Sequence, residues 1–297
     1  MGWLVQPGTG WWRGPGGVRA GWRALGYVAL VVGLLFAEAF VIPRGLLRSM
    51  MANGQLPPWF VLLNEVLFLV PVVLATAIMT QLEGRGFYSC GLAGEQRVAR
   101  FLGGAAAGLG LIFLLVLLVL VTGHAAVAWG GLRPAAVLPY ALAWGFVSFL
   151  TGLTEELALR GYLLQALQRG LGFWPALAIT SLIFGLSHIS NSGENFIGIV
   201  NVVMAGAILA LGVRGTGSLW WSIGLHGAWD YAENFLAGTP DSGQICLGTL
   251  LHTTPAGLAL LSGGATGPEG SLFSLPLLAA ALALAARAFA RPRTVVV

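Results

Sequence analysis

The stretch TEELALRGYL, residues 154–163, places three ionisable side chains in an otherwise apolar part of the chain: Glu155, Glu156 and Arg160. On a helix, Glu156 and Arg160 lie four residues apart on one face, with the carboxylate on the favourable N-terminal side. Glu155 lies about 100° around the helix from Glu156. We therefore expect Glu156 and Arg160 to neutralise each other, and Glu155 to point towards other polar groups.

Two further motifs bring histidine and aspartate to a similar depth. The next apolar segment ends in FGLSHIS, with His188 near its far end, and HGAWDY places His226 and Asp230 four residues apart. Glu155 and His188 lie at matched distances from the turn between their segments, ~21 Å at 1.5 Å per residue. Because polar groups inside a membrane usually face the bundle interior and pair there, we expect these four side chains to converge from three helices.

Such a group of carboxylates and imidazoles suits general acid–base chemistry. Spacing provides no serine or cysteine nucleophile, since Ser187 adjoins His188 and adjacent helix residues do not face each other. Water is then the natural nucleophile, which predicts hydrolysis. Glu155 and His188 would hold and deprotonate the water, and His226 would supply a proton donor to the developing oxyanion. Asp230 would orient His226 or, when protonated, donate a hydrogen bond itself.

A zinc ion bound by Glu155, His188 and His226 is the alternative, with the metal activating the water. The chain has no HExxH helix and no CxxC or Cys/His cluster, so we favour a mechanism without a metal or other cofactor. The remaining histidines, His124 and His252, fall in predicted loops and receive no role.

The elements that must position these residues are membrane spans. Of the 297 residues, 57% are hydrophobic and only 9% charged, whereas a soluble domain carries about 25% charged residues. A spanning helix needs roughly 20 apolar residues. The sequence predicts an all-α polytopic membrane protein, a bundle of about eight transmembrane helices: 24–43, 59–80, 101–122, 135–166, 174–190, 195–213, 217–237 and 271–290. A ninth apolar piece, 244–262, is interrupted by Pro255 and predicts an interfacial or re-entrant segment.

Arginine alone supplies the positive charge, because the chain has no lysine. Eight spans place both termini on one side, and the positive-inside rule makes that side cytoplasmic. The inner side would hold Arg13, Arg19, Arg23, Arg85, Arg97, Arg100, Arg169, Arg214, Arg291 and Arg293, and the outer side Arg44, Arg48 and Arg133. Cys90 and Cys246 then lie on opposite sides and form no disulfide. We expect a single membrane domain, with a cytoplasmic segment 1–23, N-terminal helices 24–134 and a core 135–290.

The three motifs together resemble the CAAX-processing and bacteriocin-processing (CPBP, also called ABI) intramembrane endopeptidases. The resemblance rests on EExxxR at Glu155, Glu156 and Arg160, FxxxH at Phe184 and His188, and HxxxD at His226 and Asp230. It extends to LLHTTPAGLALLSGGATGPEGS, residues 250–271, and covers residues 135–290.

This resemblance implies an eight-helix bundle with a membrane-embedded cavity, and hydrolysis near a substrate C-terminus, after a prenylated cysteine in the eukaryotic branch. It implies that Glu155 and His188 activate water, and that His226 and the residue four positions on form the oxyanion pocket. That residue is commonly Asn in the eukaryotic branch, and Asp230 stands here instead. Asp230 can donate a hydrogen bond only when protonated.

We therefore expect a peptidase similar to the type II CAAX prenyl proteases, a glutamate or metallo-endopeptidase integral to a bacterial plasma membrane. Its partners would be the lipid bilayer and a membrane-associated protein or peptide, with no nucleic acid. A non-catalytic immunity or interaction protein that binds a peptide through the same cluster is the alternative. A proton-coupled transporter is a third reading, which the lack of an internal repeat disfavours. Glu38, Glu65 and the loop 238–270 are left without a role.

Overall fold

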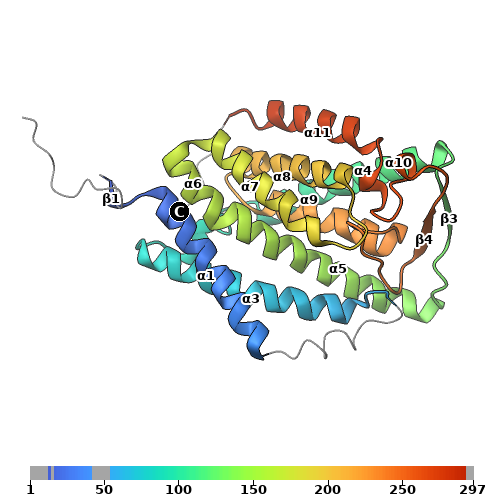
Figure 1. Ribbon diagram of the computed structural model, residues 1–297, viewed down its shortest axis with the longest axis horizontal. Coiled ribbons are helices and arrows are strands. Elements are labelled where there is room, and N and C mark those ends of the chain that lie inside the picture. Colours follow the sequence, from blue (N-terminus) through green and yellow to red (C-terminus); the bar gives the residue numbers. More distant parts are fainter. Residues whose placement is uncertain (1–12, 15–16, 42–53, 292–297) are drawn as a thin grey trace, which may run out of the picture.

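The computed structural model describes residues 13–14, 17–41 and 54–291 (Figure 1). Its principal helices are α1 (Ala20–Val41), α3 (Pro58–Leu82), α4 (Arg97–Val121), α5 (Pro134–Glu156), α6 (Leu164–Leu171), α7 (Phe173–Ser187), α8 (Phe196–Thr216), α9 (Trp220–Tyr231) and α11 (Ser274–Ala288). The prediction of an all-α polytopic membrane bundle is confirmed. Arg44, Arg48, Arg293 and the end of the first predicted span lie outside the described residues.

Six helical segments in the described part of the chain are long and apolar enough to cross a membrane. One of them is a continuous helical rod, Pro134–Leu171, in which the π-helix Leu157–Leu163 joins α5 to α6. The predicted span 217–237 corresponds to α9 and a second π-helix, Ala232–Ala237. The last predicted span corresponds to α11, a shorter apolar helix. The predicted count of eight spans thus exceeds the six that meet the length and hydropathy requirement.

The segment 244–262 contains no long helix, and its place at the membrane interface stays a prediction. It contains strand β4 (Leu251–Pro255), which pairs antiparallel with β3 (Ala125–Trp129). A four-residue helix, α10 (Ala259–Ser262), follows. The two threonines of LHTTP favour an extended backbone, and Pro255 cannot continue a helix. A second short antiparallel pair joins β1 (Arg13–Gly14) to β2 (Gly17–Val18).

The rod formed by α5 runs through the middle of the molecule, with α3 along one side (Figure 1). Helices α7 and α8 pack against each other, and α11 packs on α8. The β3–β4 pair lies at one end of the bundle, and α6 lies at the opposite end (Figure 1). Short 3-10 turns lie between the helices, at Phe87–Cys90, His188–Ser190 and Pro268–Gly270.

Glycines allow α9 to approach two neighbouring helices closely. A Cβ added to Gly152 of α5 would stand 2.9 Å from the backbone nitrogen of Gly227, and one added to Gly227 would stand 2.8 Å from the Ser148 carbonyl oxygen. Gly104 and Gly108 of α4 likewise face the backbone of α9. Small residues at helix interfaces let backbones approach in this way. The α5–α9 contact therefore sets Glu155 and Glu156 beside His226.

Candidate active site

Glu156 is the centre of a buried polar group. Its Oε1 accepts from Arg160 Nη1 at 2.8 Å and from His226 Nδ1 at 3.1 Å. Both Glu156 and Arg160 are fully buried. The expected Glu156–Arg160 pair is therefore present, and the carboxylate also holds the imidazole of α9, which the sequence did not indicate.

The other ring nitrogen of His226 faces two further carboxylates. His226 Nε2 lies 3.7 Å from Glu155 Oε2 and 3.8 Å from Asp230 Oδ2. These separations exceed a hydrogen bond and leave room for a small group to approach all three side chains. Glu155 is the more accessible carboxylate, with 22% of its side chain exposed, while Asp230 is 7% exposed.

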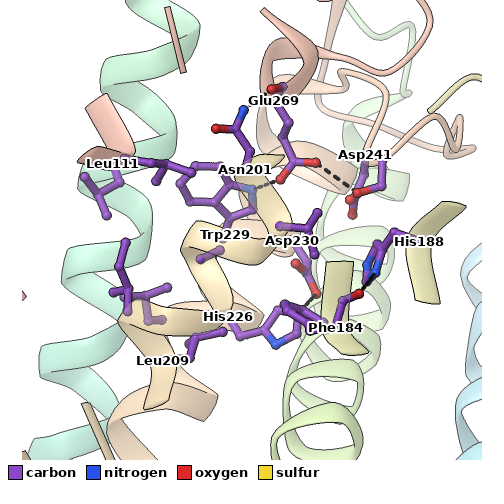
Figure 2. A pocket seen from close by; sticks show the side chains of 16 residues that line it. Leu111, Phe184, His188, Asn201, Leu209, His226, Trp229, Asp230, Asp241 and Glu269 are labelled. Carbon is purple, nitrogen blue, oxygen red and sulfur yellow. Dashed lines mark hydrogen bonds and ion pairs between the residues drawn. The ribbon is translucent and has the colours of Figure 1, made fainter. Parts of the chain in front are cut away.

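His188 approaches the same group from the end of α7. Its Nδ1 donates to the Phe184 carbonyl oxygen at 2.8 Å, which fixes the tautomer and leaves Nε2 as an acceptor. The Phe184 ring contacts both imidazoles, with its centroid 4.9 Å from the His188 ring and 5.6 Å from the His226 ring (Figure 2). The predicted convergence of Glu155, His188, His226 and Asp230 is thus present in the geometry.

The π-helix begins directly after Glu156 and contains Arg160. Its backbone departs from ordinary α-helical pairing, and such bulges occur frequently at functional sites. The Arg160 guanidinium stacks 4.5 Å from the Phe184 ring centroid. A Cβ at Gly206 of α8 would stand 2.9 Å from Arg160 Nη2, so this glycine provides the space in which the buried arginine fits.

Two cavities meet at Glu155 and His188. The larger, of about 430 Å³, is lined on its apolar side by α1, α3, α7 and the first π-helix, including Val28, Val31 and Leu35. The smaller, of about 100 Å³, is lined by polar groups that include His226 and Asp230. An apolar chamber therefore adjoins a polar one at the two residues predicted to hold water.

Several residues of the polar cavity were not assigned to the site from the sequence. Glu65 of α3 lines it with Glu155, and Glu65 Oε2 has no hydrogen-bond partner among the described residues. A lone carboxylate in an apolar span was the available signal. The loop residues Asp241, Ser242 and Gln244 also line this cavity, and no periodicity could have placed them there.

The zinc alternative can be compared with the donor geometry. In the described part of the chain, the three side chains of metal-binding type whose donor atoms lie within 4.8 Å of one another are Glu233, Asp241 and Glu269. The set of Glu155, His188 and His226 does not gather its donor atoms in this way. Zinc binding by Glu155, His188 and His226 stays an alternative prediction beside the mechanism without a metal.

Comparison with protein families gives one match. Residues 137–232 match the family described as "Type II CAAX prenyl endopeptidase Rce1-like", and this segment contains all three motifs. Comparison with curated proteins and with solved structures finds no match. The resemblance to CAAX-processing endopeptidases is therefore confirmed over residues 137–232.

Proposed function

We propose that the chain hydrolyses a peptide bond inside the membrane, with a water molecule activated by Glu155 and His188. The observation that carries the proposal is the position of these two residues where the apolar and polar cavities meet. The Glu155 carboxylate can accept a proton, and His188 Nε2 can accept a hydrogen bond from the same water. Attack on the carbonyl carbon then breaks the C–N bond, and the leaving amine takes up the proton.

His226 is proposed to stabilise the oxyanion. Its Nδ1 is held by Glu156, so Nε2 is directed towards Glu155 and Asp230. Two carboxylates facing Nε2 favour a proton on that nitrogen, which can then be donated to the developing negative charge. Glu156 and Arg160 act as positioning residues, because Glu156 holds the imidazole, Arg160 holds Glu156, and neither residue lines the cavity.

The substrate proposed is a membrane-associated protein or peptide with an apolar group next to the scissile bond. The 430 Å³ cavity lined by α1 and α7 has the apolar walls needed for a lipid chain or a hydrophobic tail. Water activation is proposed to need no metal, since the donor atoms of Glu155, His188 and His226 are not gathered as a zinc site.

The test is mass spectrometry of peptides from proteoliposomes that contain the purified chain and a prenylated or hydrophobic-tailed peptide. We expect Glu155→Gln and His188→Ala to lower turnover by at least a thousand-fold while detergent-solubilised protein keeps its melting temperature. The matched control is Glu38→Gln, a carboxylate of α1 away from the cavities. Bound peptide with no cleavage product from the wild type would instead favour the peptide-binding alternative.

Treatment with a chelator distinguishes activation of water by Glu155 and His188 alone from activation by a bound metal ion. Turnover by protein treated with EDTA and 1,10-phenanthroline is expected to remain unchanged. Loss of turnover that zinc restores would replace the metal-free proposal with a metallopeptidase.

A further inference from the structure

A second group of carboxylates lies beside the polar cavity, and the proposed peptidase chemistry does not use it. Glu233 belongs to the π-helix after α9, Asp241 to the loop that follows, and Glu269 to the 3-10 turn before α11. Carboxylate oxygens of all three lie within 4.8 Å of one another. Three separate segments of the chain thus bring their carboxylates close together.

Protein donors satisfy only part of this group. Glu269 accepts from Trp229 Nε1 at 2.8 Å and from Ser242 Oγ at 2.9 Å (Figure 2). Asp241 accepts from Asn234 Nδ2 at 2.9 Å. Glu233 is fully buried, and neither of its carboxylate oxygens has a hydrogen-bond partner among the described residues. A buried carboxylate left without a partner costs several kcal/mol, so the oxygens of Glu233 indicate a missing ligand.

Among the described residues, this group of carboxylates has no positively charged partner. Across the described residues, no arginine or histidine forms an ion pair with Glu233, Asp241 or Glu269. Asp230 also lines the cavity that Asp241 and Glu269 border. The surroundings therefore add negative charge without a protein cation to balance it.

We propose that Glu233, Asp241 and Glu269 bind a hard divalent cation of the Ca²⁺ or Mg²⁺ type. The three protein donors are all oxygens, which suit these ions rather than zinc. Ca–O distances of 2.3–2.6 Å allow ligand oxygens to stand up to about 4.6–5.2 Å apart across one ion. The three carboxylate oxygens, all within 4.8 Å of one another, are therefore close enough to share an ion. A cavity of about 60 Å³ bordered by Asp241 and Glu269 has room for water ligands.

The proposed ion would fasten the loop onto the candidate active site. Asp241 and Ser242 also line the cavity that contains His188, His226 and Asp230. Binding the ion therefore orders a cavity wall without placing the metal on the residues that activate water. This site differs from the zinc alternative both in its residues and in its donor chemistry.

Terbium luminescence tests the site, because Trp229 donates to Glu269 and an indole this close sensitises bound Tb³⁺. We use the full chain, stripped with EDTA and dialysed. We expect saturable luminescence that Ca²⁺ or Mg²⁺ displaces, and a rise in melting temperature with the same cation. Glu233→Gln should weaken binding at least ten-fold, whereas the exposed control Glu95→Gln should bind like the wild type. Trp229→Phe should lose the luminescence but keep the cation-dependent stabilisation.

Three results would overturn the proposal. The first is a stripped wild type with neither saturable luminescence nor a cation-dependent melting temperature. The second is full luminescence from Trp229→Phe, which would place the lanthanide elsewhere. The third is a Glu233→Gln variant that is more stable than the wild type and indifferent to cations, because the carboxylates would then share protons instead of an ion. If a variant fails to fold, the cation titration of the wild type still tests the proposal.

Discussion

At the scale of single residues, Glu156 links two helices through one oxygen atom. Its Oε1 accepts from Arg160 in the π-helix and from His226 in α9. Removal of one partner from a buried pair leaves an uncompensated charge, whereas removal of both does not. The free energy of unfolding should therefore respond differently to single and double substitutions.

Arg160→Met is expected to lower the free energy of unfolding by on the order of 3 kcal/mol, because the Glu156 carboxylate stays buried without its guanidinium. Glu156→Gln combined with Arg160→Met should recover a large part of that loss. Equilibrium unfolding in mixed detergent measures both values. A double variant as unstable as the sum of the two single variants would contradict the interpretation of Glu156 and Arg160 as an ion pair.

Residue types and spacing predicted part of the site. The four-residue spacings of Glu156–Arg160 and His226–Asp230, and the equal depth of Glu155 and His188, led to groups that do lie together. The bond between Glu156 and His226 could not be predicted, since it depends on how α5 is rotated against α9. The acidic residues of the 238–270 loop follow no helical period, so the sequence could not predict that they approach the cavity.

At the scale of elements, the α5–α9 interface fixes the distance between the carboxylates and the imidazole. Gly227→Ala adds a methyl group 2.8 Å from the Ser148 carbonyl oxygen and is expected to push the two helices apart. We expect turnover to fall at least a hundred-fold, because misplacement by about 1 Å costs that much in an oriented site. Peptide turnover in proteoliposomes, with folding checked by size-exclusion chromatography, measures the effect.

Gly110→Ala is the matched control for that substitution. Gly110 also lies within a helix, α4, but a Cβ there meets nothing within 4 Å. Its turnover should equal that of the wild type. Equal loss in both variants would show that any added methyl group in a helix impairs the protein, and that the α5–α9 contact has no special role.

A second element-scale contact joins four segments at Glu83, directly after α3. Arg169 lies 2.8 Å from Glu83, Arg85 3.2 Å and Arg23 3.3 Å. Tyr162 donates to the same carboxylate at 2.5 Å. These bonds tie α1, the end of α3, the first π-helix and α6 together at one end of the bundle.

The Glu83 cluster predicts a dependence of stability on pH. Burial alone would raise the pKa of Glu83, but the hydrogen bonds from Tyr162, Arg169 and Arg85 outweigh it and hold the pKa below the usual 4.5. The contribution to stability is therefore complete above about pH 4.5 and is lost as pH falls through the lower pKa of the folded state. Melting temperatures at pH 3–7 should show that the wild type loses more on acidification than Glu83→Gln does. Parallel curves would refute the role of this carboxylate.

The lengths of the apolar segments predicted the helix positions well, but they did not predict where the helices are interrupted. The predicted 135–166 and the observed Pro134–Leu171 begin one residue apart. The two π-helices, by contrast, could not be predicted, because the change in backbone hydrogen-bond pairing that defines them follows no sequence period. Strand β4 also went unpredicted. Pro255 and the threonines before it indicated an interruption of an apolar segment, and their preference for extended backbone did not identify a strand partner.

At the scale of the whole molecule, the orientation in the bilayer remains a prediction of the arginine distribution. Both cysteines are buried and unpaired, and they belong to different hydrophobic clusters. A background of Cys90→Ala and Cys246→Ala therefore allows single reporters at exposed positions. Glu95→Cys should react with an impermeant maleimide only after the cells are opened.

Leu258→Cys, in the loop before α11, should react with the same reagent in intact cells, because Leu258 is exposed and is predicted on the outer side. The permeant maleimide, which should label both positions, is the control. Reaction of both reporters from one side would contradict the predicted topology, as would the reverse pattern.

The β3–β4 pair has a consequence for how the molecule opens. Strand β3 precedes α5 and β4 follows α9. The chain from Trp129 to Leu251 therefore forms a ring, whose two ends are joined by the hydrogen bonds between β3 and β4. The residues proposed to carry out the hydrolysis, Glu155, His188 and His226, lie within that ring. Wide separation of these helices requires the hydrogen bonds between β3 and β4 to break first. The rate of amide hydrogen exchange in residues 125–129 and 251–255 would report how fast they break.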